Sequence, residues 1–139
     1  MQKVITLQNA VFWTDDSDIL RIEFKNTDPS FKLEIGSVKH FISEITSLCE
    51  GKAMPFLIDL SATRGTFTVS AAKLLANSPD LQLLRVSEAY VTKTINTKLL
   101  ITSYKRLYEP ITPFAIFNNV KSAIKYCEEF KNTQIHGSL

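Results

Sequence analysis

The sequence is poor in glycine, and this excludes two common kinds of nucleotide site. Its four glycines are far apart, at Gly36, Gly51, Gly65 and Gly137. A P-loop and a dinucleotide-binding fingerprint each need several glycines within one short motif, so that the backbone can approach the phosphates closely. Neither motif can be written anywhere in this chain.

Cysteine and long apolar runs are also scarce. The two cysteines, Cys49 and Cys127, fall on the apolar stripes of expected helices, where a free thiol behaves as a small hydrophobe. No apolar run approaches the ~20 residues that a membrane-spanning helix needs, and the first thirteen residues lack the apolar core of a signal peptide. We therefore expect a cytoplasmic protein with free thiols and no stable membrane insertion.

Charge is low and evenly mixed. The formal net charge is +2, with 22% charged and 45% hydrophobic residues. Acidic residues alternate with basic ones along the chain, whereas nucleic-acid binders concentrate Lys and Arg in a patch or stripe. We expect no nucleic-acid partner.

At 139 residues the chain fits a single domain, residues 1–139, with a core at about 10–131 and a flexible tail at 132–139.

The hydrophobic pattern predicts an α/β fold. Alternation in Ile19–Lys25 predicts a strand that pairs with Ala10–Trp13 across a polar turn. Further extended segments are expected at Phe31–Ile35, Phe56–Ile58, Ala89–Val91 and Phe114–Phe117. About four helices lie between and after them. The expected architecture is a mixed sheet with an N-terminal antiparallel hairpin and parallel central strands, flanked by these helices.

In two of the expected helices, the periodicity predicts which residues face the core. In the helix that begins near Thr68, the residues expected inside are Val69, Ala72, Leu75 and Ala76. In the helix over Asn96–Tyr108 they are Leu99, Leu100, Tyr104 and Leu107. Lys98, Lys105 and Arg106 would then form a basic outer face, which solvation explains most simply.

Few residues carry chemistry. His40 has no cysteine at ligand spacing, and Asp15, Asp16 and Asp18 lack the glycine and glutamate of a calcium-binding loop. We expect no catalytic residues, no metal and no cofactor.

The loop after Phe56–Ile58 contains more polar candidate residues than the rest of the chain. They lead into a helix N-terminus and are Asp59, Ser61, Thr63, Arg64, Thr66, Thr68 and Ser70. Such a place could bind or carry a phosphate, or its hydroxyls could simply cap the helix and satisfy turns.

Several stretches resemble a known family. PFLIDLS, AYVTK, PFAIFNN and AIKYCEEF, together with the hairpin VFWTDDSDILRIEFK, resemble small bacterial STAS-like domains related to sporulation anti-sigma-factor antagonists, and especially their poorly characterised SpoIIAA-like relatives. The resemblance implies a homodimer without cofactor or catalysis. In the antagonists, a serine at the start of the helix is phosphorylated to release a kinase. The corresponding positions here are near Thr68 and Ser70, although the antagonists' Asp-Ser-Ser-Gly pattern is absent.

The resemblance suggests two functions. The first is a non-enzymatic regulatory or protein-interaction module, phosphorylated or contacted at the loop that carries Asp59, Ser61, Arg64, Thr68 and Ser70. The alternative is a carrier or sensor of a small apolar or lipid-like ligand, since some related domains hold apolar ligands between sheet and helices. The aromatic residues that could line such a cleft are Phe12, Trp13, Tyr90 and Tyr104, although filling the core is the commoner use of aromatic side chains.

Overall fold

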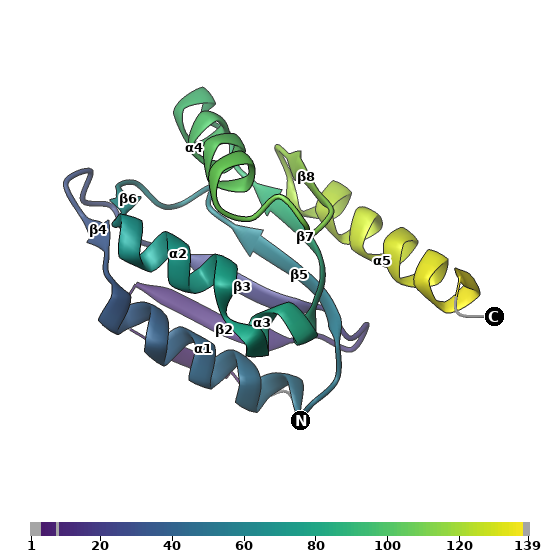
Figure 1. Ribbon diagram of the computed structural model, residues 1–139. Coiled ribbons are helices and arrows are strands. Elements are labelled where there is room, and N and C mark those ends of the chain that lie inside the picture. Colours follow the sequence, from purple (N-terminus) through teal and green to yellow (C-terminus); the bar gives the residue numbers. More distant parts are fainter. Residues whose placement is uncertain (1–3, 8, 138–139) are drawn as a thin grey trace.

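The fold is built on one six-stranded mixed sheet with the strand order β1-β2-β3-β5-β7-β8 (Figure 1). The computed structural model describes residues 4–7 and 9–137, with side chains described as far as residue 129. The strands of this sheet are β1 (Val4–Leu7), β2 (Ala10–Thr14), β3 (Leu20–Phe24), β5 (Met54–Asp59), β7 (Arg85–Val91) and β8 (Phe114–Phe117). β1, β2 and β3 are antiparallel, whereas β3, β5, β7 and β8 run parallel.

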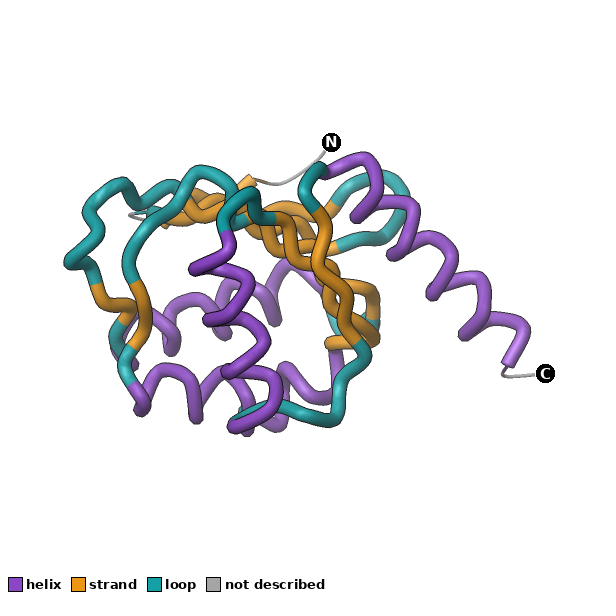
Figure 2. The backbone as a smooth tube through the Cα atoms, turned by 90° about the horizontal axis from the view of Figure 1, so that it is seen from above, coloured by secondary structure: helices purple, strands orange, loops and turns teal. Residues whose placement is uncertain are grey.

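Helices cover both faces of the sheet (Figure 2). They are α1 (Ile35–Cys49), α2 (Val69–Asn77), α3 (Pro79–Leu84), α4 (Ile95–Leu107) and α5 (Val120–Gly137). Consecutive residues of β5 point to opposite faces. Phe56 belongs to the core under α1 and α3, and Leu57 belongs to the core under α5, where Cys127 is also buried. The sheet is therefore packed from both sides around β5.

A second, two-stranded parallel sheet stands beside the main one. It joins β4 (Lys32–Leu33) to β6 (Thr66–Phe67). The loops that precede these strands are tied together, because the amide N–H of Arg64 donates to the carbonyl of Asn26 at 2.7 Å and the Asn26 side chain donates back to the Arg64 carbonyl at 2.8 Å. We call residues 26–33 and 60–67 the paired loops.

Gly65 is required where the paired loops meet. Its φ is +96°, and a Cβ at this position would lie 2.5 Å from the carbonyl oxygen of Phe31. Gly65→Ala is expected to destabilise the protein by about 1–3 kcal/mol, because the positive φ and the clash add. Gly36→Ala is the matched control: nothing lies within 4 Å of its Cβ position in α1, so it should stabilise by up to about 1 kcal/mol. Urea denaturation measures both, and equal effects would contradict this account.

The expected α/β class is confirmed, and so are the N-terminal hairpin and the parallel central strands. Both cysteines are free and buried. The edge strand β1 was not expected, and β7 begins four residues earlier than the predicted Ala89–Val91, at Arg85. The helix α5 continues to Gly137, so much of the expected tail is helical. The side chain of Phe130, expected on the inner face of this helix, lies outside the described residues.

The predicted orientations of α2 and α4 were partly wrong. Val69 is 57% exposed in the first turn of α2. In α4, Leu99 and Leu107 are exposed, whereas Ile101, Tyr104 and Lys105 are buried. Lys105 is therefore not part of a basic outer face. It points inward because two glutamates lie there to pair with it, a long-range arrangement that the periodicity of α4 alone does not contain.

Candidate functional site: an apolar cavity under α4

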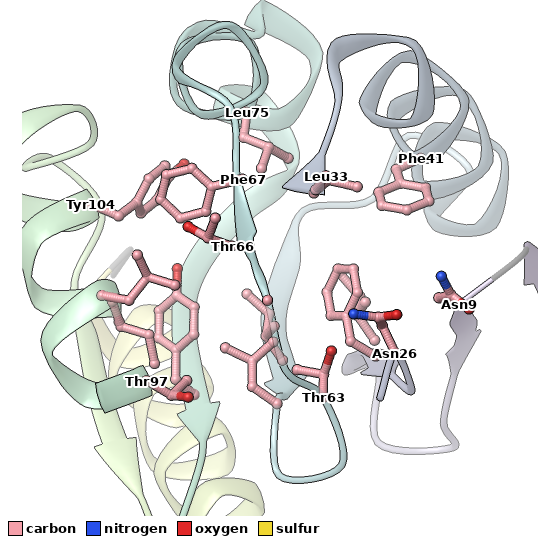
Figure 3. Close-up of a pocket in the computed structure, with 18 of the residues that line it drawn as sticks. Asn9, Asn26, Leu33, Phe41, Thr63, Thr66, Phe67, Leu75, Thr97 and Tyr104 are labelled. Carbon is pink, nitrogen blue, oxygen red and sulfur yellow. The ribbon is translucent and has the colours of Figure 1, made fainter. Parts of the chain in front are cut away.

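A cavity of about 180 Å³ lies between the sheet and the helices α1, α2, α3 and α4 (Figure 3). Apolar side chains from both layers form most of its lining. Those from the sheet are Phe12, Ile22, Phe24, Phe56, Ile58 and Tyr90, and those from the helices are Phe41, Ile45, Leu75, Leu81, Leu100, Ile101 and Tyr104. Leu33 and Phe67 of the small sheet close one side, so the paired loops form part of the wall.

Polar side chains border the cavity near the carboxyl ends of the parallel strands. Asn26 follows β3, Thr63 follows β5, and Thr97 lies in the first turns of α4 after β7 (Figure 3). The crevice beyond the carboxyl ends of parallel strands is where open α/β sheets usually bind ligands. The cavity therefore has the position expected of a binding site in this kind of fold.

Aromatic contacts hold the lining in place. The ring of Phe41 lies 5.0 Å from that of Phe12 and 5.8 Å from that of Phe24. On the other side, Phe67 meets Tyr104 edge-on at 5.6 Å. Tilted and edge-on aromatic pairs at these separations add stabilisation beyond burial. The walls on both sides of the cavity are thus fixed by ring packing between elements that are distant in sequence.

A buried charge network connects α4 to the sheet beside this cavity. The ammonium Nζ of Lys105 lies 2.5 Å from Oε1 of Glu88 in β7 and 2.5 Å from Oε2 of Glu109, just after α4. These three side chains are only 2–4% exposed. The hydroxyl of Tyr90 donates to Glu88 at 2.9 Å, and the amide N–H groups of Ile111 and Thr112 donate to Glu109. The network joins α4 to β7 through buried ion pairs.

The pKa values of the two glutamates in this network are shifted in opposite directions. Burial raises the pKa of Glu88, and the charges of Lys105 and Arg85 only partly reverse this effect. Burial also tends to raise the pKa of Glu109. The hydrogen bonds from Lys105 and the Thr112 amide, with the charge of Arg85, outweigh burial and lower that pKa. Glu109 is therefore the more firmly ionised of the two carboxyl groups.

The structure brings three of the four aromatic cleft candidates together. Phe12, Tyr90 and Tyr104 all line the cavity. Trp13 does not line it. Because neighbouring residues of a strand point to opposite faces, Trp13 lies on the far side of β2, where the guanidinium of Arg21 is 5.1 Å from its ring centroid.

The loop candidates have mainly turn and cap contacts. Oδ1 of Asp59 accepts hydrogen bonds from the amide and the hydroxyl of Ser61, at 2.9 and 2.6 Å. The hydroxyl of Thr68 caps α2 by accepting from the amide of Ala71 at 3.2 Å. Arg64 lines the cavity and its backbone joins the paired loops, while Ser70 is exposed in the first turn of α2. A regulatory role for these residues stays a prediction.

Sequence reasoning missed the charge network. One signal for it was present: Glu88 is a lone acidic residue next to the apolar run Ala89–Val91, which was itself expected to be buried. A buried glutamate needs a cationic partner, and Lys105 and Glu109 are spaced as neighbours on a helix. That Lys105 and Arg85 would be the partners follows only from the fold.

The mixed sheet and its helices have a SpoIIAA-like fold. The protein is similar to the solved structure of an uncharacterised protein of the DUF3478 family from Shewanella loihica PV-4, described as having a SpoIIAA-like fold. The TM-score is 0.57 and the identity 14%, and the match covers 91% of this chain and 92% of that one. The family model of a domain of unknown function, DUF7793, matches residues 12–131, so the chain belongs to this family.

No curated protein matches the sequence. None of the described helices is long and apolar enough to cross a membrane.

Proposed function

We propose that this protein is a non-enzymatic module that binds a small apolar ligand in the cavity under α4. The observation that carries this proposal is the cavity itself. Protein interiors normally pack with few voids. This pocket of about 180 Å³ is lined mainly by apolar side chains. A bound apolar group would remove their surface from water, which is favourable by about 25 cal/mol per Å².

The size of the cavity limits the ligand. An engineered apolar cavity of about 150 Å³ holds benzene, so 180 Å³ suits one ring or a short alkyl chain. Most drug-sized ligand sites are larger, from about 300 Å³ upward. The proposed ligand is therefore small, which narrows the original hypothesis of an apolar or lipid-like molecule. A homodimer, a protein partner and phosphorylation of Thr68 or Ser70 stay predictions.

Titration with octan-1-ol, followed by amide NMR shifts, tests this proposal. We expect saturable shifts at residues around the cavity. Ile58→Phe places a larger side chain at the cavity wall and should weaken binding at least about tenfold, which corresponds to about 1.4 kcal/mol. Because the added ring occupies existing space, the variant should fold with undiminished stability.

Ser87→Ala is the matched control for this experiment. Ser87 lies in β7 and is fully buried, but it does not line the cavity. Among the described residues its hydroxyl has no hydrogen-bond partner, so its loss is expected to be neutral or slightly stabilising. Binding should be unchanged in this variant. Absence of saturable shifts in the wild type, or undiminished binding by Ile58→Phe, would overturn the proposed function.

A further inference from the structure

Arg85 presents hydrogen-bond donors that the protein itself does not satisfy. Its side chain is only 3% exposed. Nη1 donates to the carbonyl of Leu75 at 3.2 Å, but Nη2 is 3.8 Å from the nearest Glu109 oxygen, which is beyond hydrogen-bond range. Among the residues that the structure describes, Nε and Nη2 have no hydrogen-bond partner. Buried donors without acceptors are rare and costly, and each one calls for an explanation.

The position of Arg85 supplies that explanation. Arg85 is the first residue of β7. Its side chain lines the cavity together with those of Glu88 and Tyr104. An apolar cavity with one buried guanidinium in its wall has the usual design of a site for an amphipathic molecule: a mainly hydrophobic lining with a few polar groups that fix orientation.

We propose that the ligand is a small carboxylic acid, whose apolar body fills the cavity and whose carboxylate accepts hydrogen bonds from Nε and Nη2 of Arg85. This inference rests on the proposed function and specifies the ligand class. The planar guanidinium matches a carboxylate with two parallel hydrogen bonds. A singly charged group suits this single guanidinium better than a doubly charged phosphate, since burying uncompensated charge is costly.

The hydrogen bonds of the neighbouring network agree with this assignment. Lys105 lies within 2.5 Å of both Glu88 and Glu109, whereas Arg85 pairs with Glu109 only at 3.8 Å, without a hydrogen bond. Nε and Nη2 of Arg85 are therefore the donors left for an anionic ligand. The guanidinium of Arg85 can turn toward the carboxylate without breaking a hydrogen bond to Glu109.

The test compares octanoate with octan-1-ol, two probes with the same chain length and different head groups. We expect wild-type protein to bind octanoate at least about tenfold more tightly than octan-1-ol. In Arg85→Gln, which removes the charge and Nη2, this preference should fall to within about threefold. Ser87→Ala, on the same strand, should keep the wild-type preference. If Arg85→Gln does not fold, Arg85→Lys replaces it: the charge is kept, but the two-donor edge is lost, and the preference should still fall several-fold.

The outcomes separate this inference from the proposed function. Equal binding of the two probes by the wild type, or a preference that survives in the Arg85 variant, would overturn the carboxylate assignment while leaving an apolar-ligand site. Binding of neither probe would overturn the proposed function together with this inference.

Discussion

Lys105→Met is expected to destabilise the protein by about 3–5 kcal/mol, because it leaves Glu88 and Glu109 buried without their shared ammonium group. The side chain of Lys105 is 2% exposed and is bonded to both carboxylates. Lys98→Met, on the exposed face of the same helix, is the matched control and should change the free energy of unfolding by no more than about 0.5 kcal/mol. Urea denaturation at pH 7 measures both variants.

The pH dependence identifies the cause of this loss. Without Lys105 the pKa values of both glutamates rise in the folded state, so the folded protein binds more protons than the unfolded chain as the pH falls toward the ordinary value of 4.5. Folding stability of the variant relative to wild type should therefore recover on acidification. Adding Glu88→Gln to Lys105→Met should recover part of the stability at pH 7. A small or pH-independent loss would contradict the network.

Phe12→Ala is expected to cost about 3–5 kcal/mol, the usual range for removing a buried phenyl ring. Phe12 is 0% exposed and packs on Phe41. The adjacent Trp13→Ala should cost only about 1–2 kcal/mol, since the indole is partly exposed and a surface cation–π contact contributes about 0.5–1 kcal/mol. Thermal and chemical denaturation give both values.

Ligand binding should separate the two variants further. Phe12→Ala removes part of the cavity wall and should alter octan-1-ol affinity, whereas Trp13→Ala should leave it unchanged, because the indole lies on the other face of β2. If the Trp13 variant is as unstable as the Phe12 variant, or loses ligand binding, the ligand site does not lie on the face of the sheet that carries Phe12.

Local patterns were sufficient to predict most elements of the fold. The alternation of Leu20, Ile22 and Phe24 with charged residues identified β3, and the apolar run Phe56–Ile58 identified the central strand β5. β1 was missed because it is a short edge strand whose burial pattern is only partial.

The site was less predictable than the fold. Strand periodicity could have separated Phe12 from Trp13, because adjacent strand residues point to opposite faces. Nothing in the sequence could have shown the cavity. It depends on how side chains such as Phe41, Leu75 and Ile101, from three different helices, fail to fill the space above the sheet. Lys105 was misplaced for a related reason: a charged residue is normally exposed, and the partners that bury it come from β7 and from the end of α4.

Intermolecular NOEs between octan-1-ol and the methyl groups of the protein would locate the bound alcohol. We expect contacts from both layers of the cavity at once, to Ile58 of the sheet and to Leu75 and Ile101 of the helices. Contacts confined to the exposed Leu99 and Leu107 of α4 would show that the alcohol binds only the outer surface, and would contradict the cavity as a ligand site.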